Sequence, residues 1–163
     1  MLFCGINPGL YTAAIGHHFG RPGNRFWPAL HRAGFTDRQL DPSEERELLR
    51  HGWGITKVLG RPTATADEVT AGELAAGGRA LVEKARTFRP RWVAILGVGA
   101  YRTAFGHPRA ALGRQEETMA NASVWVLPNP SGLNAHYRLE DLAEKLPELR
   151  LAVQEGSRCE SVR

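Results

Sequence analysis

Short runs rich in apolar residues recur along the chain and predict β-strands. Each run is too brief for a helix of ordinary length, and the near-continuous apolar run of residues 92–96 is typical of a central parallel strand that is covered on both faces. The runs comprise residues 1–6, 53–59, 92–96 and 123–127. A more polar stretch, residues 113–121, predicts a loop or an edge hairpin. The sequence therefore predicts a sheet of four main strands.

Segments with apolar residues at helical spacing separate these runs and predict helices. They comprise residues 25–33, 43–50, 70–88, 100–105 and 139–151. Thr70 and Glu73 form a capping-box signature at the start of the longest segment, and Pro147 is expected to bend or break the last one. Strands that alternate with helices predict a three-layer α/β/α fold with a mainly parallel, four-stranded central sheet.

Length and composition fit one globular domain, because the chain has 163 residues, of which 42% are hydrophobic and 23% charged. We expect this domain to span residues 1–152 and a disordered tail to follow over residues 153–163. No apolar run approaches the roughly 18 residues of a membrane span, and no basic segment precedes Leu2 as it would in an export signal. We therefore expect a cytoplasmic protein without a membrane partner.

Charge and cysteine content narrow the possible partners only a little. The net charge of +4 is compatible with a nucleic-acid partner, because Lys and Arg neutralise phosphates, but proteins without such a partner share it. Cys4 and Cys159 are too few for a disulfide framework or a structural zinc site. The adjacent His17 and His18 also lack the spacing of metal ligands. We expect free thiols, no metal and no other cofactor.

Loops of turn-forming residues follow the first and the last predicted strand. Residues 5–9 are Gly-Ile-Asn-Pro-Gly, and residues 127–133 are Leu-Pro-Asn-Pro-Ser-Gly-Leu. Because ligands in open α/β sheets bind beyond the carboxyl ends of the strands, we expect both loops to line one site. The Asn7 amide does not ionise near neutral pH, so it can hold a water molecule but cannot act as a general base. An ordinary turn is the alternative for this first loop.

Several motifs, taken in order, resemble a known family. They are residues 5–9, 19, 21–27, 54–57, 61–63, 95–97 and 127–133. Together they resemble the mismatch-specific uracil/thymine DNA glycosylases of the uracil-DNA glycosylase superfamily, from the first residue to about residue 151. Members usually carry further residues before the first strand, so we expect that the chain starts late or is a trimmed form.

The resemblance implies an enzyme of base excision repair that acts on double-stranded DNA. Such an enzyme flips uracil, ethenocytosine or a related damaged pyrimidine out of a G·U mismatch, or more weakly thymine out of G·T. It then hydrolyses the N-glycosidic bond and leaves an abasic site. The resemblance further implies a monofunctional, monomeric and nucleoid-associated enzyme, with residues 1–152 as its catalytic domain.

The resemblance also assigns a pocket for the flipped base. It makes Asn7 the catalytic residue that holds the attacking water, and Phe19, in the aperiodic loop of residues 10–24, the ring on which the base stacks. Ile6, Gly9, Lys57 and Asn129 are the remaining substrate-binding residues that it implies. Gly9 stands where uracil-strict relatives carry a bulky aromatic residue, which implies room for larger pyrimidines.

Lys57 stands where other members of the superfamily keep an asparagine that recognises uracil. The sequence leaves three interpretations of this lysine open: a solvated charge at a strand end, a contact to phosphate or base, and an amine that forms a Schiff base with an opened sugar. A strictly uracil-specific pocket is therefore not expected.

The second loop is implied to enter the duplex. Its residues are Pro130, Ser131, Gly132, Leu133, Asn134 and Arg138. A proline-stiffened loop that ends in a leucine suits an apolar wedge between base pairs, and the alternative is that Leu133 packs beneath the next helix. Residues 134–138 form a longer insertion than in the best-known members, so Arg138 is only a candidate contact to the opposite guanine.

Other function classes fit less well. A nucleoside hydrolase would need clustered aspartates for Ca²⁺ at the strand ends, which the sequence lacks. A dinucleotide-binding loop at Gly97 and Gly99 would need a third glycine where Arg102 stands. A binding module that flips a base without cutting remains an alternative to the enzyme.

Overall fold

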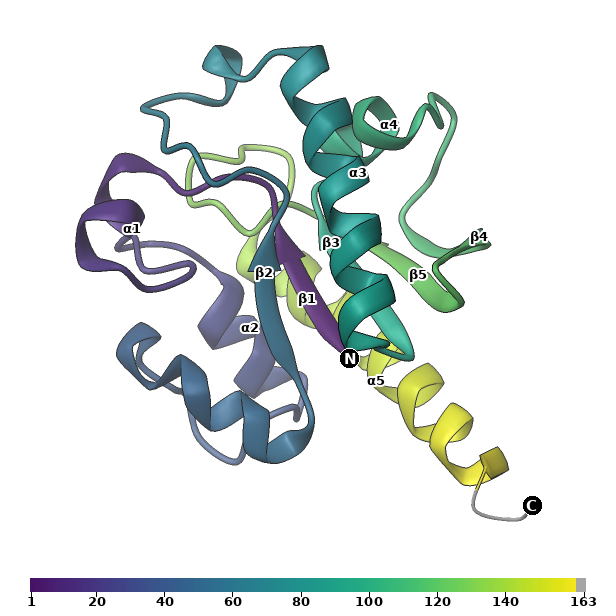
Figure 1. Cartoon of the computed structure of the whole chain (residues 1–163). Coiled ribbons are helices and arrows are strands. Elements are labelled where there is room, and N and C mark those ends of the chain that lie inside the picture. Colours follow the sequence, from purple (N-terminus) through teal and green to yellow (C-terminus); the bar gives the residue numbers. More distant parts are fainter. Residues whose placement is uncertain (161–163) are drawn as a thin grey trace.

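A five-stranded sheet forms the centre of the molecule in a computed structural model, which describes residues 1–160 and the side chains of residues 1–156 (Figure 1). The strands are β1 (Leu2–Gly5), β2 (Gly54–Lys57), β3 (Trp92–Leu96), β4 (Gly113–Met119) and β5 (Ala122–Leu127). Their order is β2-β1-β3-β5-β4, with the first four parallel and β4 antiparallel to β5. The mainly parallel α/β sheet is confirmed. The expected count of four is corrected to five, because the polar stretch pairs with β5 as an edge hairpin.

Helices cover both faces of this sheet, so the three-layer prediction is also confirmed (Figure 1). The helices are α1 (Leu10–Ile15), α2 (Phe26–Arg32), α3 (Ala71–Phe88), α4 (Val98–Phe105) and α5 (Leu139–Glu160), with 3-10 helices η1 (Pro42–His51) and η2 (Ala66–Glu68). Helices α2 and α5 pack on one face, and α3 and α4 pack on the other.

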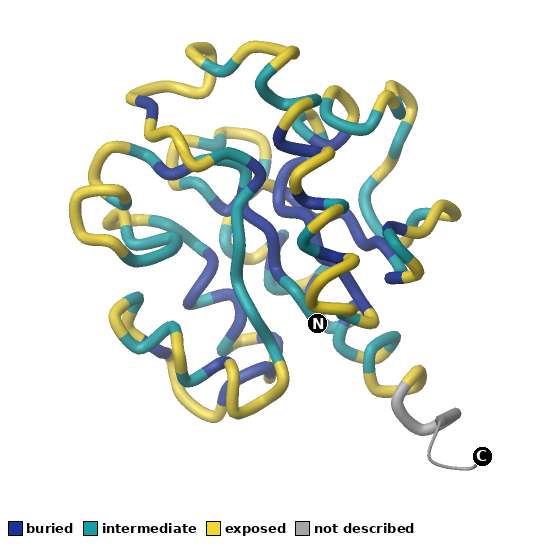
Figure 2. The backbone as a smooth tube through the Cα atoms, in the orientation of Figure 1, coloured by how far each residue is buried: buried dark blue, intermediate teal, exposed yellow. Residues whose placement is uncertain are grey.

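The buried strands divide their side chains between two cores. In β3, Trp92, Ala94 and Leu96 face the core beneath α2 and α5, whereas Val93 and Ile95 face the core beneath α3 and α4. All five residues of β3 are buried, as Figure 2 shows for the centre of the sheet. Burial of a large apolar side chain contributes about 1.5–3 kcal/mol, so the two cores make the sheet a rigid platform for the loops at its edge.

Helix α1 corrects the expectation of a loop without regular structure over residues 10–24. It is only six residues long and buries none of them, so its sequence carries no periodic apolar signal. Gly16 ends the helix in the left-handed conformation, at φ 74°, and its N–H donates to the Thr12 carbonyl. The glycine C-cap therefore sets where this helix ends, and no buried face contributes to it.

The C-terminal helix corrects the predicted tail. Helix α5 continues through Pro147 to Glu160, so residues 153–160 are helical, and residues 161–163 lie outside the described part of the chain. Leu146 and Leu149 are fully buried on either side of the proline, and Val153 packs against the same core. These contacts hold the helix where local propensity predicts a break.

The order of the strands creates a switch point between β1 and β3. The chain passes from β1 to β2 on one side and later places β3 on the other side of β1, so the loops after β1 and β3 diverge. The Gly97 turn between β3 and α4 lies against both neighbours: a Cβ there would lie 3.0 Å from Ile6 Cγ1 and 3.9 Å from Asn129 Cβ. The two loops predicted to share a site therefore meet across Gly97.

None of the helices among residues 1–160 combines the length and the apolar character needed to cross a membrane.

Candidate active site

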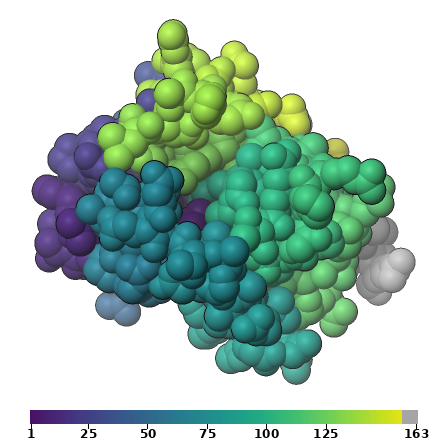
Figure 3. Space-filling model, turned by 90° about the horizontal axis from the view of Figure 1, so that it is seen from above, coloured from purple at the N-terminus to yellow at the C-terminus, as the bar shows by residue number. Residues whose placement is uncertain are grey.

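The carboxyl ends of the parallel strands bring most of the predicted site residues to one edge of the sheet. Lys57 ends β2 in register with Gly5 at the end of β1, and Ile6 and Asn7 follow directly. Asn129 follows the end of β5. Figure 3 looks onto this edge: the yellow-green segment after β5 projects on one side, the blue to teal segment between β2 and α3 lies opposite, and purple N-terminal atoms show between them.

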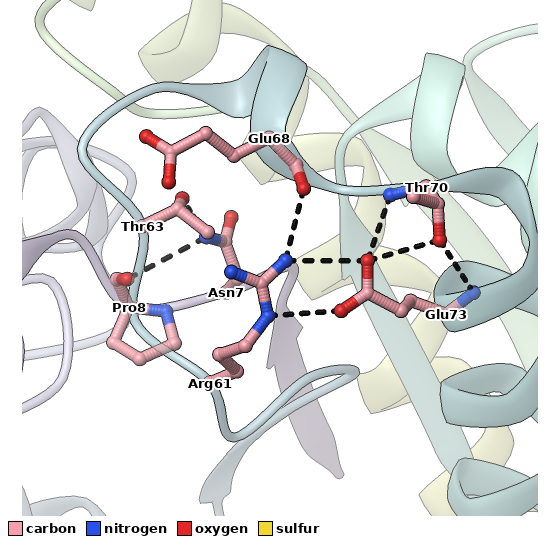
Figure 4. Close-up of polar contacts among 7 residues, drawn as sticks. All are labelled: Asn7, Pro8, Arg61, Thr63, Glu68, Thr70 and Glu73. Atoms are coloured by element: carbon pink, nitrogen blue, oxygen red, sulfur yellow. Dashed lines mark hydrogen bonds and ion pairs between the residues drawn. The ribbon is translucent and has the colours of Figure 1, made fainter.

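Thr63 fixes the orientation of the Asn7 side chain. Asn7 Nδ2 donates to Thr63 Oγ1 at 2.5 Å and makes a longer contact of 3.5 Å to the Pro8 carbonyl (Figure 4). Thr63 is itself held, because its N–H donates to the Pro8 carbonyl at 3.1 Å and only 3% of its surface is exposed. The amide nitrogen is thus bound to the protein, which leaves the amide oxygen as the acceptor for a ligand.

A network at the start of α3 supports the segment that carries Thr63. Arg61 binds both carboxylate oxygens of Glu73, at 2.8 and 3.2 Å, and the Glu68 carbonyl at 2.9 Å (Figure 4). Glu73 also completes the predicted capping box with Thr70. The hydrogen bond from Arg61, followed by those from Thr70, lowers the pKa of Glu73 to about 2. The N-terminus of α3 therefore anchors the loop that holds the Asn7 amide.

Phe19 lies over the end of β1. Its ring stacks on Phe26 with centroids 4.1 Å apart and ring planes 28° apart, and a Cβ at Gly5 would lie 3.1 Å from its Cε1 and Cζ atoms. Its φ of 54° is left-handed, a conformation that costs a residue with a side chain about 1–3 kcal/mol. The ring is half-buried against the core, so Phe19 both packs against the core and lies beside the predicted pocket.

Lys57 is half-buried at the carboxyl end of β2. Its carbonyl accepts from Lys84 Nζ at 3.4 Å, and the same amine donates to Thr56 Oγ1 at 3.0 Å. The Lys84 amine therefore contacts β2 from α3, whereas the role of the Lys57 amine stays a prediction.

Cys4 lies in β1, and its thiol is free. Burial raises the pKa of this thiol to about 12, which makes Cys4 a packing residue.

The loop after β5 is built from turns closed by its own side chains. Asn129 Oδ1 accepts from the Ser131 N–H at 2.9 Å, and Ser131 Oγ accepts from the Leu133 N–H at 3.3 Å. Asn134 Nδ2 donates back to the Asn129 carbonyl at 3.0 Å. The side-chain oxygen of Asn129 therefore accepts a hydrogen bond within the loop, which leaves the side-chain nitrogen for the predicted contact with substrate.

Leu133 projects from this loop with 66% of its surface exposed. It does not pack beneath the next helix, so that alternative is wrong. Arg138 lies just before α5, and its N–H donates to Asp141 Oδ2 at 2.6 Å while the residue stays exposed. A contact from Arg138 to an opposite guanine remains a prediction.

A cavity of about 800 Å³ lies beside the predicted site and not within it. Phe19 and Arg21 contribute to its wall, together with residues 39–43, but Asn7, Lys57 and Asn129 do not. The predicted base pocket is therefore defined by the strand ends and the Asn7–Thr63 contact, and not by this cavity. Among residues 1–156, whose side chains the structure describes, His, Cys, Asp and Glu form no group of three that could hold a metal ion.

Sequence reasoning gave no role to two residues that shape the site. Thr63 belongs to one of the motifs on which the resemblance rests, but only the fold places it against Asn7. The sequence predicts only the start of a helix at Arg25, yet the Arg25 guanidinium contacts the loop after β5. Neither contact leaves a local pattern in the sequence, because each joins segments that are far apart along the chain.

A doubly wound α/β sheet with a polar amide at its switch point is typical of proteins that bind a ligand beyond the carboxyl ends of their strands. The family model described as Uracil DNA glycosylase superfamily matches residues 1–151. The chain belongs to this superfamily, whose members are DNA glycosylases that hydrolyse N-glycosyl bonds in base excision repair. At this level the expected glycosidase activity and the DNA partner are confirmed.

Proposed function

We propose that the chain is a monofunctional uracil-DNA glycosylase of the mismatch-specific uracil/thymine branch. It removes uracil from G·U pairs in double-stranded DNA, and ethenocytosine or, more slowly, thymine opposite guanine. It acts as a cytoplasmic, nucleoid-associated monomer. The observation that carries the proposal is the Asn7 amide, whose nitrogen is held by Thr63 and whose oxygen is left to accept a hydrogen bond from water.

Selection for mispairs begins before the chemistry in this proposal. The target nucleotide must leave the duplex, and extrusion costs least where the base is already mispaired. The extruded base stacks on Phe19 at the end of β1, while Leu133 enters the space that it vacates. The exposure of Leu133 and the place of Phe19 beside Gly5 support these two roles.

The hydrolytic step uses water as nucleophile. Asn7 Oδ1 positions the water molecule, and the oxygen of this water bonds to C1′ of the sugar. The N-glycosidic bond breaks, and its electron pair leaves with the base. The water loses a proton and the departing base gains one. Backbone N–H groups near Ile6 and Phe19 stabilise the charge that develops on the base. Because Asn7 carries no charge to stabilise the sugar cation, uracil and damaged pyrimidines leave faster than thymine.

Space at Gly9 supports the acceptance of larger bases. A Cβ at this position would have no heavy atom within 4 Å, so the loop after Asn7 is open where uracil-strict relatives carry an aromatic ring. A methyl group or an exocyclic adduct on the pyrimidine is accommodated there.

Labelled duplexes that differ only at one pair test the proposal. G·U, A·U, G·T and G·ethenocytosine duplexes are incubated with the chain, and each is analysed on a denaturing gel with and without alkali. We expect G·U to be cut well above A·U, and only after alkali. Breaks without alkali would assign a lyase step to an amine such as Lys57, and no cut in any duplex by the folded chain would favour the binding module.

Asn7→Ala tests the assigned water-holding residue in the same assay. We expect excision of uracil from G·U to fall by roughly 100-fold, because misplacement of a reacting group has effects of this size. Circular dichroism and thermal unfolding establish that the variant is folded. Full excision by this variant would show that another residue holds the water.

A further inference from the structure

Arg25 binds the whole loop that follows β5. Its Nη1 donates to the carbonyl oxygens of Ser131 at 3.1 Å and Asn134 at 2.9 Å, and also to that of Tyr137. Its Nη2 lies 3.4 Å from the Gly132 carbonyl oxygen. One guanidinium thus gathers four carbonyl groups of a loop more than 100 residues away along the chain.

The backbone around Arg25 adds two further contacts to this loop. The Arg25 N–H donates to the Pro130 carbonyl at 2.9 Å. A Cβ at Gly132 would lie 2.7 Å from the Gly23 carbonyl oxygen, so the loop rests directly on the chain just before α2. Helix α2, anchored in the core by Phe26, therefore supplies a fixed base for an otherwise polar and exposed segment.

Arginine suits this task better than other residues. The guanidinium is planar, stays charged, and presents five N–H donors in a fixed geometry, whereas lysine offers three donors from one nitrogen atom. Within the described part of the chain, Arg25 forms no ion pair, and its partners are carbonyl oxygens. Because the Arg25 guanidinium binds only backbone carbonyl groups of the loop, we infer that its role is to fix the conformation of the loop.

We propose that Arg25 is a positioning residue that holds residues 130–137 in the conformation from which Leu133 enters the duplex. The inference rests on the proposed function, since it assigns Leu133 to the vacated base position. A loop that is ordered before binding loses less conformational entropy on insertion. Arg25 also adjoins Phe26, on which Phe19 stacks, so one short segment positions both the base-stacking ring and the wedge.

Arg25→Lys tests the inference by comparing two substrates. Insertion of a wedge matters only in a duplex, so a single-stranded oligonucleotide that contains uracil needs the chemistry but not the loop. We expect excision from the G·U duplex in single turnovers to fall by roughly 10- to 100-fold, the range that misplaced groups produce. Excision from the single strand should change by less than about twofold, since Asn7 and Phe19 keep their own contacts.

Matched variants distinguish the positioning role from a general effect of replacing an arginine by lysine or of lost structure. Arg32→Lys makes the same replacement in α2, at an exposed arginine that pairs with Glu140, and should leave both substrates unaffected. Gly132→Ala pushes the loop away from Gly23 without altering Arg25, so it should reproduce the duplex-specific loss even if Arg25→Lys folds poorly. An equal loss on both substrates, or a full duplex rate for both loop variants, would overturn the inference.

Hydrogen exchange gives a readout that needs no cleavage. In Arg25→Lys, the amides of Ser131, Leu133 and Asn134 should exchange faster, whereas those of β3 should keep their rates. Binding to a duplex that holds a tetrahydrofuran abasic analogue beside 2-aminopurine then reports whether the wedge enters. If the native chain cuts no DNA, the proposed function fails; if loop exchange and 2-aminopurine emission do not respond to Arg25→Lys, the inference fails.

Discussion

At the scale of single residues, the amide of Asn7, the proposed catalytic residue, is oriented by one neighbour. Asn7 presents its nitrogen to Thr63 Oγ1 and leaves its oxygen for water. Thr63 is almost fully buried, so the hydroxyl keeps this place without competition from solvent. A buried acceptor that fixes an amide is worth more than its own hydrogen bond, because its loss would leave the Asn7 nitrogen with only the longer contact to the Pro8 carbonyl.

Thr63→Val is expected to lower excision of uracil from G·U by about tenfold, which corresponds to about 1.4 kcal/mol of transition-state stabilisation. Valine keeps the shape of threonine but cannot accept the hydrogen bond from Asn7. Single-turnover rates measure the effect. Thr36→Val is the matched control, since Thr36 Oγ1 is buried with no hydrogen-bond partner in the described structure. Equal rates for the native chain and Thr63→Val would contradict this role.

Gly9→Tyr is expected to narrow the substrate range. Gly9 has φ −68° and ψ 163°, an extended conformation that any residue adopts, and the space around it is open. The rate of uracil excision should stay within about threefold of the native rate. The rates for thymine and ethenocytosine opposite guanine should fall by more than about tenfold, because the tyrosine ring would crowd these larger bases in the pocket. Gly99→Ala, at another open position, serves as the control. Unchanged rates on all three bases would place the specificity elsewhere.

At the scale of elements, the start of α3 stabilises the segment that carries Thr63. Arg61 joins this segment to Glu73, the residue that also caps the helix. The contacts are exposed, so salt and solvent weaken them, and their effect is local order more than global stability. Contacts thus link the start of α3 to the Asn7 amide, by way of Arg61 and the segment that carries Thr63.

Glu73→Gln is expected to loosen this segment in a pH-dependent way. The pKa of Glu73 is lowered from 4.5 to about 2, so its contribution is fully present above pH 4.5 and is lost as the pH falls toward 2. Hydrogen exchange of residues 61–70 should therefore differ between variant and native chain at neutral pH, and the difference should shrink as the pH falls from 4.5 toward 2. Glu83→Gln, which removes an ion pair with Arg86 from the same helix, is the control. A difference of the same size at neutral pH and at pH 2 would contradict the assignment.

At the scale of the whole molecule, the strand order places the predicted base pocket and the predicted wedge loop on one face. The predicted base pocket lies at the ends of β1 and β2, and the loop after β5 projects beside it (Figure 3). The sheet between them is buried on both faces and keeps the two at a fixed separation. In our proposal, a duplex on this face meets the wedge and the pocket at the same time.

Leu133→Ala is expected to lower excision from duplex DNA by about tenfold and to spare single-stranded substrate. A smaller apolar group fills less of the vacated stack, where unstacking costs a few kcal/mol per step. The thermal midpoint should not change, because the side chain is 66% exposed. Leu49→Ala is a matched control, with 61% of that leucine exposed in η1. Equal losses on both kinds of DNA would show that Leu133 does not act as a wedge.

The sequence by itself determined the elements that depend on local patterns. Apolar-rich runs predicted the four parallel strands, most clearly β3, which is buried at every position and apolar throughout. The capping box fixed the start of α3, and turn-forming residues marked the loops at both ends of the site. The sequence did not predict α1, because this helix buries no residue and so has no apolar periodicity. It predicted a bend or break at Pro147, but α5 continues past this residue because core contacts override local propensity.

Only the tertiary structure decided which residues act together. The strand order put β1 beside β3 and so made the loop of Asn7 a neighbour of Gly97 and Asn129. Thr63 reached Asn7 across 56 residues, and Arg25 reached the loop after β5 across more than 100. Contacts between such distant residues depend on how whole layers pack, and no periodicity within either segment records them.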